Sequence, residues 1–188
     1  MKDLSDKKIV IIGDLHLTDK DSKIVKKSLN LLKRKYDLVI INGDLSDKLF
    51  CRFTDWFNTW GDEFKDNKYL LIRGNHDFQE IEMKDFFQFI YNGKRYDVRH
   101  GYKVNRLPHF IKIYISIFDR FICCFGKNLP DCIYKFFNKT QKQSLIKGFI
   151  NVRSHTHCYE VSSNYINTGV FVCGNRIIGH KIRKWKVL

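Results

Sequence analysis

Residues 8–16 read Lys-Ile-Val-Ile-Ile-Gly-Asp-Leu-His, and this stretch decides the fold. Four consecutive apolar residues, three of them isoleucine, predict a strand that is buried on both faces. A glycine ends the run, and a carboxylate and an imidazole follow it directly. Ligands of open α/β sheets bind beyond the carboxyl ends of the strands. The stretch therefore places two chemically active side chains where a site is expected.

Two later stretches repeat this arrangement. Residues 37–43 and 68–74 are further apolar runs that end in glycine, followed by Asp44 and by Asn75-His76-Asp77. The segment between the first two runs has apolar residues at helical spacing, and the segment between the second and third is rich in aromatic residues. We therefore expect helices over 21–35 and 50–64. Alternating strands and helices predict parallel strands joined by right-handed crossovers.

The second half of the chain has a different pattern. Short alternating or apolar runs separated by turn residues predict strands at 95–99, 149–153, 165–167, 170–173 and 176–187. Residues 107–147 look helical and unusually aromatic. We expect one mixed α/β domain over residues 1–188, with a parallel first sheet and a more antiparallel second sheet.

Composition limits the class of protein. The 188 residues include 34 Lys and Arg against 20 Asp and Glu, a net charge of +14, which favours anionic partners. Phosphate esters, nucleic acid and an anionic membrane surface all fit that charge. The chain has no uncharged apolar run of membrane-spanning length, its first five residues form no apolar signal region, and its six cysteines include no CxxC pair. We therefore expect a cytoplasmic protein.

Two more short motifs extend the set at the strand ends: His100-Gly101 and His155-Thr156-His157. Singly each is weak, because an aspartate after glycine is often a turn residue and a lone histidine is often structural. Together they favour a metal site, since Asp14-x-His16 and His155-x-His157 each place two donors on one side of an extended segment. Carboxylate, imidazole and amide donors suit Mn²⁺, Fe²⁺ or Zn²⁺ better than Ca²⁺.

In this order the motifs resemble those of the calcineurin-like metallophosphoesterase superfamily, from Gly13 to His157. The resemblance implies a two-sheet β-sandwich flanked by helices, with a helical, lid-like insertion at 103–147 between His100 and His155. It also implies two divalent metal ions, of which Mn²⁺ is the first expectation. One ion would be held by Asp14, His16, Asp44 and His157, and the other by Asp44, Asn75, His100 and His155.

The same resemblance implies the chemistry. Asp44 would bridge the ions, and a metal-bridging hydroxide would attack phosphorus in line with the departing oxygen. His76 would stabilise or protonate the leaving group, and Asp77 would orient His76 by accepting its ring N–H. The chain departs from the family at Ser154, where glycine is usual. His109 is a rival to His100, but it precedes an apolar stretch that suggests a structural role.

Within the superfamily, the layout looks most like the UDP-2,3-diacylglucosamine pyrophosphohydrolase group, which shares Asp-Leu-His-Leu and a helical lid. His76, however, stands where that group usually has arginine. Aromatic residues recur at helical spacing through 107–125, and nine basic residues lie in 103–147. An aromatic stripe often packs in a core, but apolar and basic residues together also predict contact of 107–137 with an anionic membrane.

We therefore predict an enzyme that hydrolyses a phosphomonoester, phosphodiester or pyrophosphate in a small or lipid-linked anionic substrate. Two alternatives stay open. The charge and the aromatic residues would also suit a nuclease or nucleotide phosphodiesterase. A non-catalytic scaffold of the same fold would use the aromatic segment as a partner-binding face.

Overall fold

The structure is a computed structural model, and it describes residues 1–20, 22–101, 139, 142, 145–156, 159–169, 171–173 and 176–177. The helices of this part are α1 (Lys23–Lys35), α2 (Phe53–Trp60) and the 3₁₀ turn η1 (Glu63–Lys65). The strands, in chain order, are β1 (Lys2–Asp3), β2 (Ile9–Ile12), β3 (Leu38–Asn42), β4 (Tyr69–Ile72), β5 (Phe87–Tyr91), β6 (Lys94–Val98), β7 (Ile150–Arg153), β8 (Glu160–Val161), β9 (Tyr165–Asn167), β10 (Val172–Cys173) and β11 (Arg176–Ile177).

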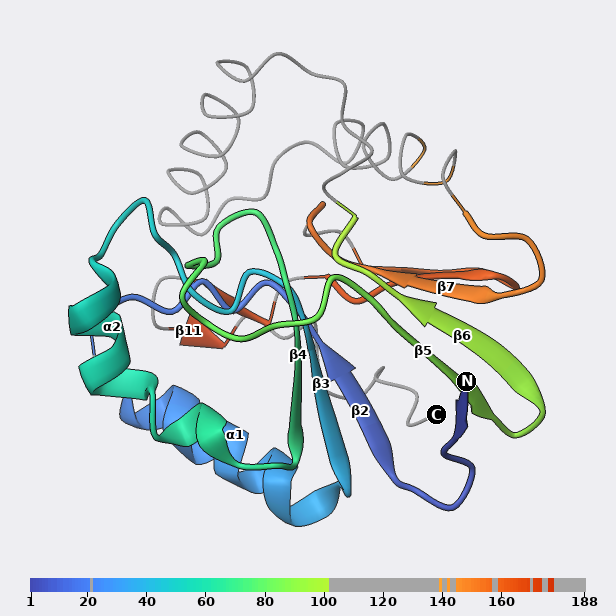
Figure 1. The fold of residues 1–188 in the computed structure, drawn as a ribbon, viewed down its shortest axis with the longest axis horizontal. Coiled ribbons are helices and arrows are strands. Elements are labelled where there is room, and N and C mark those ends of the chain that lie inside the picture. Colours follow the sequence, from blue (N-terminus) through green and yellow to red (C-terminus); the bar gives the residue numbers. More distant parts are fainter. Residues whose placement is uncertain are drawn as a thin grey trace.

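The first sheet has the order β2-β3-β4 and is parallel throughout, as predicted. Its strands match the three apolar runs to within two residues at each end. Helix α1 begins at its N-cap Ser22, whose hydroxyl accepts a hydrogen bond from the Val25 N–H. Basic residues fill its last turn, where they complement the helix dipole. In Figure 1, α1 and α2 lie on one side of this sheet and β5–β7 lie on the other.

The predicted helix over 50–64 is shorter and interrupted. Helix α2 ends at Trp60, and the 3₁₀ turn η1 follows after Gly61. Glycine is a poor residue for a helix interior because it loses the most backbone entropy. The aromatic content of the segment is explained by packing, since Trp56 and Trp60 are both buried against the first sheet.

The second sheet has six strands in the order β1-β5-β6-β7-β9-β8, and it is mixed. Two of its pairings are antiparallel (β5 with β6, and β8 with β9), and three are parallel, so the expected antiparallel character is confirmed only in part. The β5–β6 hairpin turns at Asn92-Gly93, whose φ angles of 49° and 73° are both positive. Asn-Gly is the favoured sequence for such a turn. A separate hairpin pairs β10 with β11.

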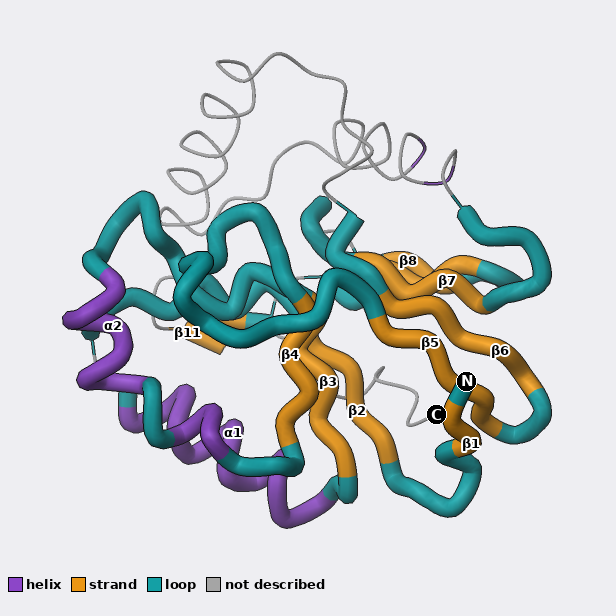
Figure 2. The backbone as a smooth tube through the Cα atoms, in the orientation of Figure 1, coloured by secondary structure: helices purple, strands orange, loops and turns teal. Residues whose placement is uncertain are grey.

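The helices and the two sheets form layers (Figures 1 and 2), and an apolar core lies between each pair of neighbouring layers. One core fills the space between the first sheet and the two helices, around Val25, Ile41 and Trp56. The other lies between the two sheets, where Ile11 and Ile40 meet side chains of the second sheet such as Phe89. The predicted mixed α/β fold with two sheets flanked by helices is confirmed.

Most of the insertion at 103–147 lies outside the described residues, as do the aromatic segment 107–137 and the end of the predicted strand at 176–187. Their predicted structure and membrane contact stay predictions. Among the described helices, none combines the length and the apolar character that crossing a bilayer requires.

Candidate metal centre

The loops that follow β2, β3 and β4 are tied to one another by backbone hydrogen bonds. The N–H of Asp14 donates to the Gly43 carbonyl at 3.1 Å, and that of His16 donates to the Asp44 carbonyl at 2.8 Å. The N–H of His76 donates to Oδ1 of Asp44 at 2.9 Å. Because the strands are parallel neighbours, their carboxyl ends meet at one edge, and these bonds fix the three loops there.

Each strand-ending glycine makes room for a side chain of the site. A Cβ on Gly43, whose φ is +78°, would lie 2.7 Å from Cβ of His100 and would overlap its ring. A Cβ on Gly74 would overlap the Asp44 carboxylate, with Cγ at 2.9 Å. A Cβ on Gly13 would lie 2.8 Å from that of Ser154. Real Cβ contacts this short essentially do not occur, so the glycines are required by side chains that arrive from other segments.

One group of donors consists of Asp14, His16 and Asp44, whose ligand atoms all lie within 4.8 Å of one another. Nε2 of His16 is 3.8 Å from Oδ2 of Asp44. All three residues have left-handed backbones, with φ of 54°, 47° and 49°. Such conformations are costly for residues with a Cβ and concentrate at functional sites. The fourth predicted member of this group, His157, lies outside the described residues.

The second group consists of Asp44, His100 and His155, again with ligand atoms within 4.8 Å. Nε2 of His100 lies 3.1 Å from Oδ2 of Asp44 and 3.1 Å from Oδ1 of Asn75. The backbone N–H of His155 donates to the Asp14 carboxylate at 3.0 Å, which joins the two groups. The structure thus brings together the four residues predicted for the second ion, and His100 occupies the position for which His109 was the rival.

The charges of the site stabilise one another. Burial opposes ionisation of Asp44, but His100, His16 and His76 outweigh it and hold the pKa of Asp44 well below its usual value. Burial likewise opposes protonation of His100, but Asp44 and Asp14 raise its pKa to about 9. The lowered pKa keeps the buried Asp44 carboxylate in its ionised form, which is the form that binds a cation.

Asp47 is a site residue that the sequence reasoning missed. It is 1% exposed, and its Oδ1 and Oδ2 each lie 3.4 Å from a histidine nitrogen, Nδ1 of His76 and Nδ1 of His16 respectively. These three residues form a further cluster of donors. The rings of His16 and His76 meet edge to face, with centroids 4.9 Å apart. The available signal was the spacing Gly43-Asp44-Leu45-Ser46-Asp47, which puts a second aspartate in the same loop.

In the described part of the chain the Asp77 carboxylate is hydrogen-bonded to Ser46 and Gly74 and not to the ring of His76, so this predicted hydrogen bond is corrected. Its Oδ1 accepts hydrogen bonds from the backbone N–H and the hydroxyl of Ser46, and its Oδ2 accepts one from the Gly74 N–H at 2.7 Å. The carboxylate braces the loops after β3 and β4, and Asp47 takes the place beside His76. The reason is that the chain turns back after Gly74, which brings the Asp77 carboxylate to the Gly74 N–H at the start of the same loop.

The departure at Ser154 is accommodated without backbone strain. The left-handed residue of this loop is His155, with φ of 75°, and Ser154 does not have a positive φ. Ser154 is fully buried, and its side chain fills the space that Gly13 leaves. The usual glycine is therefore not required here for its conformational freedom.

The donor set fits a divalent transition-metal ion. Carboxylate oxygens, imidazole nitrogens and the Asn75 amide oxygen converge from five segments of the chain, and such mixed oxygen and nitrogen donors are typical of Mn²⁺, Fe²⁺ and Zn²⁺ sites. The Asp44 carboxylate belongs to both donor groups.

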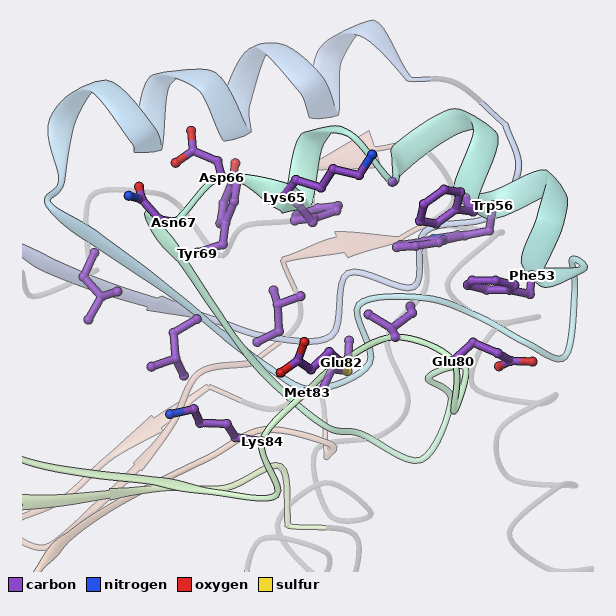
Figure 3. A pocket seen from close by; sticks show the side chains of 17 residues that line it. Phe53, Trp56, Lys65, Asp66, Asn67, Tyr69, Glu80, Glu82, Met83 and Lys84 are labelled. Carbon is purple, nitrogen blue, oxygen red and sulfur yellow. The ribbon is translucent and has the colours of Figure 1, made fainter.

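A hollow of about 590 Å³ lies elsewhere, along β4 and α2. Figure 3 shows Phe53 and Trp56 on one side of it, facing Glu80 and Glu82. Of the predicted metal ligands that the structure describes, none lines this hollow.

Comparison with known proteins identifies the family of the chain. The model of the calcineurin-like phosphoesterase family matches residues 7–167. Similar solved structures include the phosphoesterase YfcE from E. coli (17% identity, TM-score 0.47, 87% of this chain and 79% of that chain). Vacuolar protein sorting 29 from Cryptosporidium parvum is also similar (14% identity, TM-score 0.49, 88% of this chain and 76% of that chain).

A comparison with curated protein sequences gives no match. The family model spans every described motif of the site, from Asp14 to Thr156. The chain therefore belongs to the calcineurin-like phosphoesterase family.

Proposed function

We propose that the chain is a metal-dependent phosphoesterase that binds two divalent ions. Mn²⁺ is the metal we expect at both positions. The observation that carries this proposal is the position of Asp44, whose buried carboxylate is shared by both donor groups. Asp14, His16 and Asp44, with His157 from the sequence motif, would hold one ion. Asp44, Asn75, His100 and His155 would hold the other.

Two divalent ions bound to these residues would supply Lewis acidity to a phosphoryl group and activate water at neutral pH. The contribution of the chain is to fix the donors in advance. Backbone hydrogen bonds tie the loops that carry Asp14, Asp44 and His76 to one another. The loops therefore need little rearrangement when an anionic substrate arrives.

His76 is the residue we assign to the leaving group. Burial opposes its protonation, but the contact with Asp47 and the charges of Asp44 and Asp47 raise its pKa. A protonated imidazole held by Asp47 through Nδ1 would keep Nε2 available to donate a proton to the departing oxygen. In this arrangement Asp47 orients the ring and His76 donates.

For the substrate, we propose a small or lipid-linked phosphate ester. The net charge of +14 favours an anionic compound, and the sequence layout resembles enzymes that cleave a lipid-linked pyrophosphate. A nucleotide or single-stranded nucleic acid would satisfy the same charge, so both belong in the test.

The test begins with protein stripped by a chelator and reloaded with Mn²⁺, Fe²⁺ or Zn²⁺. Hydrolysis is measured on p-nitrophenyl phosphate, bis-p-nitrophenyl phosphate, nucleotides, a UDP-lipid pyrophosphate and single-stranded DNA. We expect activity that returns with metal and is lost in Asp44→Asn. Asp6→Asn, which changes an exposed aspartate outside the site, is the matched control.

Metal stoichiometry separates the alternatives. Two ions bound to the wild-type chain and none or one bound to Asp44→Asn would support the shared carboxylate. A folded wild-type chain that binds no ion and hydrolyses none of these compounds would contradict the proposal and favour the non-catalytic scaffold.

A further inference from the structure

Ser154 stands where the family usually has glycine, and its hydroxyl reaches a predicted metal ligand. The side chain is 0% exposed, and Oγ lies 2.8 Å from Nδ1 of His100. The same hydroxyl donates a hydrogen bond to the backbone carbonyl of Asn42 at the end of β3. A residue with no side chain could make neither contact.

These contacts determine which nitrogen of His100 carries a proton. Nδ1 also lies 3.1 Å from the Asn42 carbonyl oxygen, which can only accept. Because the Ser154 hydroxyl gives its own proton to that carbonyl, its oxygen is free to accept from Nδ1 as well. All three contacts are satisfied together when Nδ1 is protonated and donates to both oxygens.

The other side of the ring then faces the site. Nε2 of His100 lies 3.1 Å from Oδ2 of Asp44 and 3.1 Å from Oδ1 of Asn75, so it points at the two other donors. A neutral ring with its proton on Nδ1 has its lone pair on Nε2, where an ion would bind. Groups that hold a ligand histidine in this way raise metal affinity.

We infer that Ser154 is a positioning residue that holds His100 in the tautomer and orientation that present Nε2 to an ion. The inference rests on the metal-dependent function proposed above and concerns one of its two ion sites. The Ser154 hydroxyl lies 2.8 Å from Nδ1 of His100, a ligand of the second group, whereas Oδ1 of Asp14 in the first group lies 3.9 Å from that same nitrogen. Ser154 should therefore affect the two sites unequally.

The experiment is a calorimetric titration of chelator-stripped protein with Mn²⁺, which measures the number of ions bound and the affinity of each site. Wild type should bind two ions. Ser154→Ala should weaken one site by roughly 10-fold and leave the other unchanged. Ser154→Gly, which leaves room for a water molecule in place of the hydroxyl, should recover part of that loss.

A matched control is Ser22→Ala, which removes another buried serine hydroxyl, the N-cap of α1, in a part of the fold that does not contact the site. It should lower thermal stability and leave both Mn²⁺ affinities as in wild type. A second readout is the ¹⁵N spectrum of the Zn²⁺-loaded chain. There the Nδ1 resonance of His100 should shift, and its proton should exchange faster, in Ser154→Ala.

Equal Mn²⁺ binding by wild type and Ser154→Ala would overturn the inference and leave the proposed function standing. A uniform weakening of both sites, with lower thermal stability, would also overturn it, because it would show a general structural role. If Ser154→Ala does not fold, Ser154→Gly decides: a smaller weakening confined to one site supports the inference, and Mn²⁺ binding equal to wild type at both sites contradicts it. A wild-type chain that binds no ion would overturn the proposed function and this inference with it.

Discussion

Oδ1 of Asp47 lies 3.4 Å from Nδ1 of His76, and Oδ2 of the same buried carboxylate lies 3.4 Å from Nδ1 of His16. One side chain therefore touches both a predicted metal ligand and the predicted proton donor. Asp47 is thereby placed to hold the two rings in a fixed relation to each other.

We predict that Asp47→Asn slows hydrolysis of substrates with poor leaving groups by roughly 10- to 100-fold, a part of what general acid catalysis contributes. The reason is that the amide orients His76 less well and removes the charge that favours its protonation. Rates are measured at saturating Mn²⁺ on a series from p-nitrophenyl phosphate to alkyl phosphates. An equal loss across the series would contradict the assignment.

Asp77→Ala should behave differently, because the Asp77 carboxylate braces two loops through hydrogen bonds to Ser46 and Gly74. The change leaves the buried N–H groups of Ser46 and Gly74 without their acceptor, at a cost of about 1–3 kcal/mol each. We expect a lower denaturation midpoint in urea. The ratio of rates between p-nitrophenyl phosphate and an alkyl phosphate should stay as in wild type, and a changed ratio would return a leaving-group role to Asp77.

Gly43→Ala should disable the site that contains His100. The new methyl group would overlap the His100 ring, in addition to the strain of a φ of +78°. Gly93→Ala is the matched control, since its φ is +73° but no atom lies within 4 Å of the added Cβ. Both should lose about 1–2 kcal/mol of stability from the backbone alone. Only Gly43→Ala should also lose an Mn²⁺ site in calorimetry, and retention of both ions would argue against the tight fit.

The metal-free protein should become less stable as pH rises from about 6.5 to about 9. The pKa of His100 is raised to about 9 from an ordinary value of 6.5, so the folded state binds the proton more tightly than the unfolded state. The stabilisation is complete below pH 6.5 and is lost as pH passes 9, amounting to about 3 kcal/mol at most. The raised pKa of His76 acts in the same direction.

Urea unfolding at several pH values measures this effect, with His100→Gln as the variant that should flatten the curve. In the metal-loaded protein an ion would replace the proton on Nε2, so this decline should disappear. A metal-free wild type whose stability does not change over this range would contradict the ion pair between His100 and Asp44.

The first sheet was predictable because β2, β3 and β4 are uninterrupted apolar runs that end in glycine. Strand β5 was not predicted although Asn92-Gly93 signals a hairpin, because Phe89, Ile90 and Tyr91 break the alternation of apolar and polar residues that marks a half-buried strand. The two-residue strands β1 and β8 show no periodicity. The parallel pairing of β7 with β6 joins segments that are distant in sequence, and no local pattern specifies it.

The site was predictable to the extent that its residues follow strand ends. Asp14, Asp44 and Asn75 each lie within three residues of the end of a strand, so topology alone brings them together. Asp47 lies farther along its loop, and its position depends on a backbone contact in which its N–H donates to the Leu17 carbonyl at 3.2 Å. The prediction that Asp77 orients His76 was wrong for a similar reason. The turn at 74–77 directs the Asp77 carboxylate back to the N–H of Gly74.

The three glycines at the strand ends have a consequence for protein engineering. Each glycine has no side chain, and a residue from a remote segment fills the space that its Cβ would occupy. Ser154 does so at Gly13, His100 at Gly43 and Asp44 at Gly74. Grafting only the acids and imidazoles onto another scaffold would fail, because an alanine at any of these three positions would displace the incoming group. A successful graft must include the three glycines together with the residues that pack against them.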